Sequence, residues 1–180
     1  MSITQSLYSK AFAFLDPDNR GSNVHTGSQV TLRTYESRLL VKFESLPDQF
    51  RFKRISGAQL FFYFLATEGS YDWYDAHANT KEFDEKTATW DTWNETGYNL
   101  VFQRKGVGNA PVWAEFPSAS ILFGDAVTYG IRLQSSLLNA KPFTVQTSGA
   151  NRPYLVLTID ESATADTLNI SSMSPNAGAI

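Results

Sequence analysis

The stretch that decides the fold is residues 56–93, SGAQLFFYFLATEGSYDWYDAHANTKEFDEKTATWDTW. It opens with an apolar run at residues 58–65 and ends with an acidic phrase that runs into tryptophan, residues 83–90. Short apolar runs bounded by polar and turn-forming residues are typical of buried β-strands. The stretch therefore predicts two strands of a β-sandwich, joined by an aromatic loop that a ligand can reach.

Strand patterns recur along the rest of the chain, whereas no window keeps the apolar spacing of a capped helix over three turns. Residues 38–43 form an apolar run flanked by cations, as expected of a central strand. Residues 58–65 are apolar on both faces, so we expect both faces to be buried, in a sandwich or at an oligomer contact. The other predicted strands are residues 7–14, 29–33, 73–78, 87–93, 98–103, 127–133 and 154–159.

These patterns predict an all-β chain, an antiparallel β-sandwich in which residues 87–93 and 98–103 pair around a turn at 94–97. A length of 180 residues suits one domain, which we place at residues 1–160. Residues 161–180 contain no aromatic residue and are mostly Ser, Ala, Thr and Asn. Such a segment buries too little apolar surface to offset its chain entropy, so it is predicted to be a flexible linker or tail.

Composition excludes several classes of function. The chain has no cysteine, which rules out disulfides and thiolate sites. Its net charge is −3 with no dense cationic cluster, so no nucleic-acid partner is predicted. No apolar run approaches the ~20 residues that span a bilayer, so no membrane insertion is expected. The N-terminus lacks the basic and apolar regions of a signal peptide.

Residues capable of catalysis are present but not in a convincing pattern. His25 and His77 are far apart and have neither metal-ligand nor triad spacing. Glycoside hydrolysis needs two carboxylates, and four lie near two tryptophans in an arrangement that a sugar cleft can use: Glu82, Asp84, Glu85 and Asp91, beside Trp90 and Trp93. The favoured alternative is a structural turn in which a carboxylate accepts backbone N–H groups. We therefore predict no catalytic residue, no metal ligand and no enzyme activity.

A loop near the N-terminus contains oxygen ligands suited to calcium: Asp16, Asp18, Asn19 and Asn23. The spacing of a calcium loop is missing, and Asp-Pro-Asp-Asn is also an ordinary turn sequence. No cofactor is therefore predicted, and a structural calcium ion is kept as the less favoured alternative.

Aromatic residues make up 14% of the chain and supply candidates for a glycan platform. An exposed aromatic ring can cover the apolar C–H face of a sugar. The candidates are Tyr71, Trp73, Tyr74, Trp93, Tyr98 and Trp113. Trp73 and Trp93 are preferred because polar residues flank them. The competing interpretation, which we rank higher, places these rings in the core or at a subunit contact.

Several phrases, in order, resemble the DNRLRE-type β-sandwich family, whose relatives occur as carbohydrate-binding modules and cell-surface domains. The matching pieces are residues 27–32, 38–43 with Leu46 and Pro47, 55–60, 83–85 with Thr89 and Trp90, 129–133 and 152–158. Residues 99–123 do not align. The resemblance implies a jelly-roll sandwich with a non-catalytic, adhesive role.

In lacking a signal peptide and ending as if interrupted, the chain is similar to the N-terminal domain of a phage fibre or other virion appendage. This context implies a virion or extracellular surface location, other assembly proteins as partners, a cell-surface glycan as a ligand, and a homo-oligomer. The alternative function is a carbohydrate-binding module attached to a larger secreted enzyme or cell-surface protein.

Overall fold

The computed structural model describes residues 1–33, 36–67, 73–93, 99–105, 112–117, 127–135 and 142–164. The strands found there are β1 (Ser2–Leu15), β2 (Gln29–Leu32), β3 (Arg38–Phe43), β4 (Lys53–Thr67), β5 (Trp73–Ala78), β6 (Asn99–Lys105), β7 (Val112–Pro117), β8 (Ile131–Ser135), β9 (Phe143–Gln146) and β10 (Tyr154–Thr164). The 3-10 helices are η1 (Pro17–Asn19), η2 (Asp48–Phe50) and η3 (Gly149–Asn151). The predicted all-β class is confirmed. Within these residues, no helix is long and apolar enough to cross a membrane.

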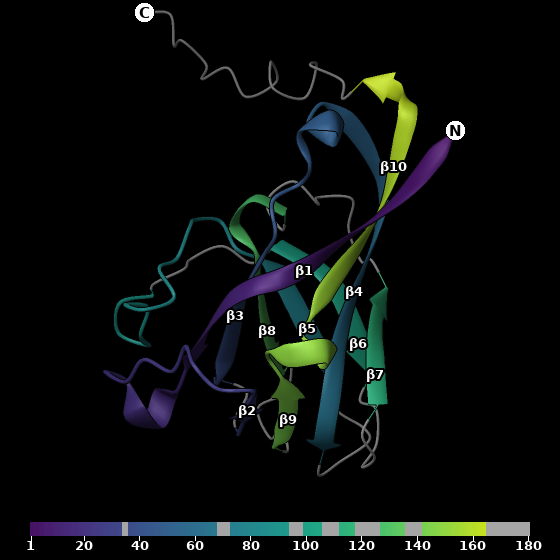
Figure 1. Ribbon diagram of the computed structural model, residues 1–180. Helices are drawn as coiled ribbons and strands as arrows, with labels where there is room; N and C mark the ends of the chain where they lie inside the picture. The colour runs from purple at the N-terminus through teal and green to yellow at the C-terminus, as the bar shows by residue number, and fades with distance from the viewer. Residues whose placement is uncertain are drawn as a thin grey trace, which may run out of the picture.

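Strand β1 connects the two halves of the sheet (Figure 1). Its first half pairs with β10, from Ser2 opposite Asp160 to Tyr8 opposite Tyr154. Its second half pairs with β3, and the register shifts between Ser9 and Ala11. A shift of this kind is a β-bulge, which bends the strand and increases its twist. One strand therefore belongs to both halves.

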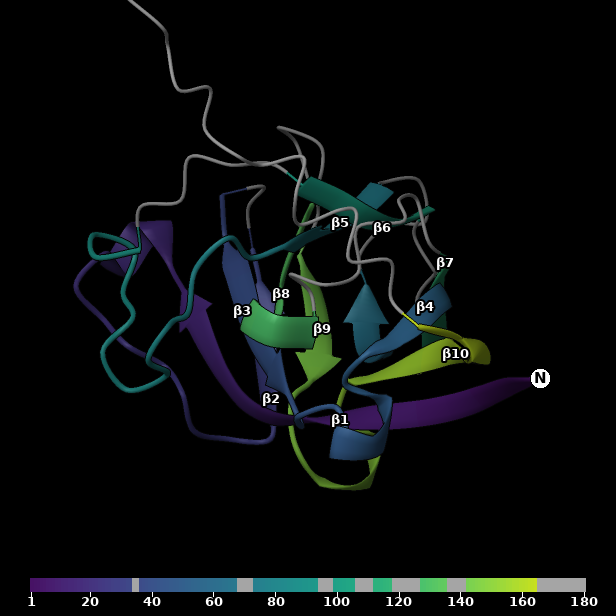
Figure 2. The same ribbon diagram turned by 90° about the horizontal axis from the view of Figure 1, so that it is seen from above.

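All strand pairs are antiparallel among the described residues, and the order across the sheet is β2-β9-β4-β10-β1-β3-β8-β5-β6. Strand β7 pairs with the edge of β4 opposite to β10. Strands β6 and β7 lie close to each other, so the β6 end of the sheet approaches the strand attached to β4 (Figure 2). The sheet thus curls around its own interior.

The main core lies between the two halves of the sheet. Leu60, Phe62 and Phe64 of β4 are fully buried and alternate with half-buried residues, as the two-residue period of a strand requires. Tyr74 of β5 lies 4.5 Å from Phe143 of β9 and 5.3 Å from Phe64, measured between ring centroids. Rings from opposite halves are therefore in contact across one shared interior.

A second, smaller apolar cluster lies beneath the segment 79–93. Leu15 of β1, Leu40 of β3, Phe83 and Trp93 are its largest buried members. The segment is fastened by Asn23, whose amide donates to the carbonyl oxygens of Glu85 at 3.0 Å and Ala88 at 2.5 Å. This segment therefore covers a face of the β1–β3 half that would otherwise be exposed to solvent.

Several predicted strands are confirmed, and β3 and β5 have the predicted bounds. Residues 7–14 and 58–65 fall inside the longer strands β1 and β4. Strand β10 continues to Thr164, beyond the domain boundary predicted at residue 160. The outward side chains Phe61, Tyr63 and Leu65 are half-buried, so the interior of this chain covers only the inward face of the run, and burial of the outer face at an oligomer contact stays a prediction.

The predicted strand at 87–93 is wrong, because this segment is a series of turns. The Thr92 hydroxyl accepts from the Thr89 backbone N–H at 2.9 Å, and the Trp93 N–H donates to the Thr89 carbonyl at 2.9 Å. Local bonds of this kind satisfy the backbone without a neighbouring strand. Strand β6, predicted as its partner, pairs with β5 instead.

The predicted strand at 127–133 is only half correct. Residues 127–129 form a helical turn, and the strand begins after Gly130. Gly130 has φ +87°, and an added Cβ would lie 2.1 Å from the carbonyl oxygen of Val41. Only glycine fits this conformation so close to the β3 backbone.

We predict that Gly130→Ala destabilises the fold by about 3 kcal/mol or more, because the new methyl group meets backbone rather than a movable side chain. Urea unfolding followed by circular dichroism measures the effect. Gly21→Ala is the matched control, because nothing lies within 4 Å of a Cβ at that position. Equal stability of the two variants would contradict the close approach of β8 to β3.

Candidate functional site

The six aromatic residues predicted as a glycan platform do not form one surface. Tyr71 and Tyr98 lie outside the described residues. Trp73 begins β5 opposite Lys105 of β6, and Trp113 lies in β7 opposite Tyr63 of β4. For these two residues the structure gives the backbone pairing alone.

Tyr74 and Trp93 are enclosed in two different apolar clusters. Tyr74 is 1% exposed in the main core. Trp93 is 5% exposed in the second cluster, where its ring meets Phe83 edge-on at 5.8 Å. An enclosed ring presents no face to a ligand, so the prediction is wrong for these two residues. They occupy the core positions that the competing interpretation gave them.

A different set of aromatic rings forms a row on the outward face of the sheet. Tyr8 of β1 is directly opposite Tyr154 of β10, which is directly opposite Phe61 of β4. The Tyr154 and Phe61 rings stack at 4.7 Å with 7° between their planes, and Tyr8 lies 5.6 Å from Tyr154 at 41°. We call these three residues the aromatic ladder. None of them was among the predicted site residues.

The ladder is bordered by two charged residues. The guanidinium of Arg152 lies 5.0 Å from the centroid of the Tyr8 ring, and it contacts the carboxylate of Glu44 at 3.5 Å. Glu44 also accepts the backbone N–H of Tyr8 at 3.2 Å. Arg152 and Glu44 remain 41% and 47% exposed, so both charged groups are accessible beside Tyr8.

The ring geometry determines what the ladder can bind. Two rings with parallel planes and centroids 4.7 Å apart must cover each other's faces, because coplanar rings at that spacing would overlap. One face of Tyr154 and one face of Phe61 are therefore closed to a sugar, which stacks on an open ring face. Tyr8, at 40% exposed, is the most accessible of the three.

The carboxylates considered for glycoside hydrolysis have structural partners in three cases. Glu82 pairs with Lys42 at 3.1 Å, and Asp91 pairs with Arg20 at 2.8 Å. Asp84 accepts the backbone N–H of Lys86 at 2.8 Å, as the structural-turn interpretation expects. Glu85 lines a surface cleft that is described below.

The loop considered for calcium forms a turn. Asp16 accepts the backbone N–H of Asp18 at 3.1 Å and caps η1. The side-chain amide of Asn23 binds the segment 79–93, and its oxygen contacts the His25 ring. Among the described residues, no three His, Asp or Glu side chains are grouped to hold a metal ion. The calcium ion stays a prediction with no geometry to support it.

His77 has a pKa well below its usual range. It is buried on β5 directly opposite Arg132 of β8, which is fully enclosed. Burial, followed by the positive charges of Arg132 and Arg38, lowers the pKa of His77 to about 4. Arg38 also stacks over the half-buried Trp90 ring at 4.4 Å. His77 is therefore neutral near pH 7.

No known protein family and no curated protein matches this sequence. The likeness to DNRLRE-type domains therefore rests on the quoted phrases alone. Function has to be argued from the geometry of this chain.

We predict that His77 makes the fold lose stability as the pH falls. Above pH 6.5 the imidazole is neutral in both states; between pH 6.5 and about 4 only the unfolded chain binds the proton. The unfolding free energy should therefore fall by about 2–3 kcal/mol over this window through His77 alone. Unfolding in urea at successive pH values measures it.

His77→Gln should flatten the decline by this amount. An equally steep decline in His77→Gln would show that His77 does not carry the effect.

Proposed function

We propose that this chain is a non-catalytic structural and adhesive module of a virion appendage or another surface assembly. We further propose that its sheet is a β-sandwich of jelly-roll type. The contacts of Phe64 and Phe143 with Tyr74 support the sandwich, because they join opposite halves of the sheet face to face. The adhesive role is what the resemblance to DNRLRE-type domains implies.

The observation that carries the proposal is the aromatic ladder with its bordering charges. Tyrosine and arginine are enriched in the central parts of protein interfaces, where they supply large contact area at small entropic cost. In the ladder, Tyr154 and Phe61 each cover one face of the other, and Glu44 accepts the backbone N–H of Tyr8. A surface of stacked rings and phenols suits a protein partner better than a sugar.

The partner that fits best is a second copy of this chain. Arg152 and Glu44 lie side by side with opposite charges and a separation of 3.5 Å. In a two-fold symmetric contact each surface meets itself, so the arginine of each copy can face the glutamate of the other. The surface is therefore self-complementary in charge as well as apolar.

The alternative, a carbohydrate-binding module, remains the second candidate. It is supported by a different region, the polar cleft analysed below, and it does not exclude self-association. Since appendage and surface proteins combine assembly with adhesion, both surfaces could serve one protein.

We predict a dimer whose stability depends on the ladder. Tyr8→Ala should weaken association about tenfold or more, because it removes the most exposed ring of the contact. Phe52→Ala is the matched control: that ring is 71% exposed but lies outside the ladder. Multi-angle light scattering across a concentration series measures the change. A chain that stays monomeric at the highest soluble concentration would refute the assembly role.

A charge exchange tests the orientation of the contact. Arg152→Glu and Glu44→Arg should each weaken the dimer, because like charges then meet across the interface. The double variant should restore it. Failure of the double variant to recover, with both single variants folded, would show that these residues do not face each other across the two-fold axis.

A further inference from the structure

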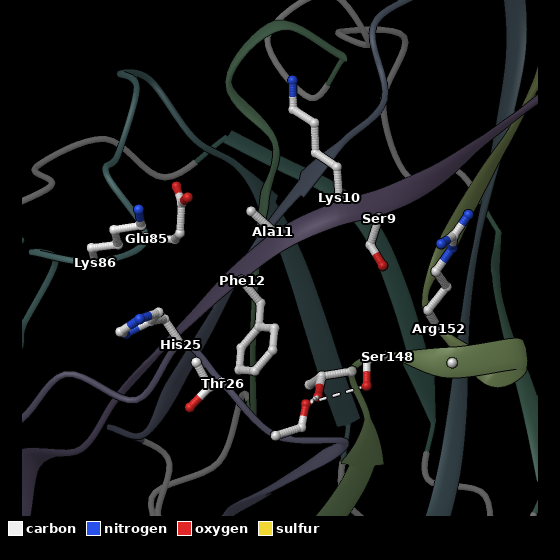
Figure 3. Close-up of a pocket in the computed structure, with 13 residues that line it drawn as sticks. Ser9, Lys10, Ala11, Phe12, His25, Thr26, Glu85, Lys86, Ser148 and Arg152 are labelled. Carbon is white, nitrogen blue, oxygen red and sulfur yellow. Dashed lines mark hydrogen bonds between the residues drawn. The ribbon is translucent and has the colours of Figure 1, made fainter.

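A cleft of about 460 Å³ lies where β1 passes from one half of the sheet to the other. Figure 3 shows Phe12 of β1 at its centre, with His25 on one side and Ser148 and Arg152 on the other. This volume is within the range of small-molecule sites in proteins. The bulge at Ser9–Ala11 forms one wall, so the cleft is a direct product of the strand's irregularity.

Ser9 provides an observation that points to a ligand. Ser9 is only 6% exposed, and its hydroxyl has no hydrogen-bond partner among the described residues. In Figure 3 the hydroxyl points from β1 toward the space bounded by Phe12, Ser148 and Arg152. Buried polar groups are normally paired, so an unpaired one in a cleft wall is an available binding group.

The hydroxyl is itself closed off from solvent, although it lies in the wall of the cleft. A ligand therefore reaches it only when a neighbouring side chain moves. Arg152 is the side chain placed to move, because it is 41% exposed and its contact with Glu44 is long, at 3.5 Å. Exposed ion pairs of this kind hold weakly.

The remaining groups in the cleft suit a compound with many hydroxyl groups. The hydroxyls of Thr147 and Ser148 both donate to the carbonyl oxygen of Gly27, at 3.3 and 3.2 Å. Their oxygens therefore still have lone pairs to accept hydrogen bonds. Lysine and arginine supply donors on the same rim, and Phe12 supplies an apolar base. Sugars combine donors, acceptors and an apolar C–H face in this way.

The charges favour an acidic sugar over a neutral one. Lys10, Lys86 and Arg152 line the cleft, against one carboxylate, Glu85. Even with Glu44 counted against Arg152, cations remain in excess, in a chain whose net charge is −3. A carboxylate on the ligand is the group that such a rim binds through charge-assisted hydrogen bonds.

We propose that this cleft binds a sugar residue carrying a carboxylate, as found in acidic polysaccharides. The proposal deepens the adhesive part of the proposed function by naming its ligand class. The Ser9 hydroxyl binds a sugar hydroxyl, Arg152 binds the carboxylate, and Phe12 lies against the ring. The site is separate from the ladder except for Arg152, which borders both.

Isothermal titration of the full chain with a uronic acid tetrasaccharide tests the proposal, with a neutral galactose tetrasaccharide as the matched ligand. We expect the acidic tetrasaccharide to bind at least tenfold more tightly, with an affinity that falls as salt is raised. Ser9→Ala should weaken binding at least fivefold while leaving the melting temperature unchanged or higher, because it removes an unpaired buried hydroxyl. Ser56→Ala, a serine on β4 away from the cleft, should bind like the parent chain.

Arg152→Gln should also weaken binding and reduce its salt dependence. Equal binding of the two tetrasaccharides, parent-like affinity in both Ser9→Ala and Arg152→Gln, or no binding to the folded chain would each overturn the proposal. Its failure is distinguishable from failure of the assembly role: a dimer that binds no acidic sugar overturns only the cleft, and a monomer that binds it overturns only the interface.

Discussion

The passage of β1 from one half of the sheet to the other is the constraint on which the structure depends. Every backbone N–H and C=O in a strand needs a partner, and β1 finds its partners on β10 up to Tyr8 and on β3 from Ser9 onward. The strand bulges at the point of exchange, between Ser9 and Ala11, and the bulge bends and twists it. The shared core, the outward position of Tyr8 and the cleft beside Ser9 all follow from this one irregularity.

The local pattern of the sequence is sufficient to predict the strands that are buried by long-range packing. Residues 38–43 and 73–78 have the predicted bounds, because their apolar runs are as long as the segments that pair with neighbouring strands. Prediction fails where the backbone is satisfied locally. Thr89 and Thr92 form hydrogen bonds with each other inside a turn. Gly130 has a positive φ and lies against the backbone of Val41, a contact between residues distant in sequence. Strands β7 and β9 lie in stretches for which no strand was predicted.

The functional surface was harder to predict than the fold, for a physical reason. Alternation shows which residues share a face of a strand, but not which residues of other strands lie beside them. Tyr8, Phe61 and Tyr154 are distant in sequence and become neighbours only through the register of three strands. Tyr74 and Trp93 are aromatic and have polar neighbours in the sequence, as residues of a binding platform do, yet both lie in apolar clusters. Aromatic content alone does not separate a core from a surface.

The register of β1 and β10 has a mechanical consequence. Ser2 lies opposite Asp160, and the carbonyl of Met1 accepts the N–H of Glu161, so the two strands end at the same pole (Figure 1). A force that pulls these ends apart loads the hydrogen bonds of the pair one after another, as in opening a zipper. Antiparallel bonds lie perpendicular to the strands, so each one bears the load alone before the next is reached. The module should therefore yield at low tension when it is stretched from its two ends, and resist far better when it is sheared along β4.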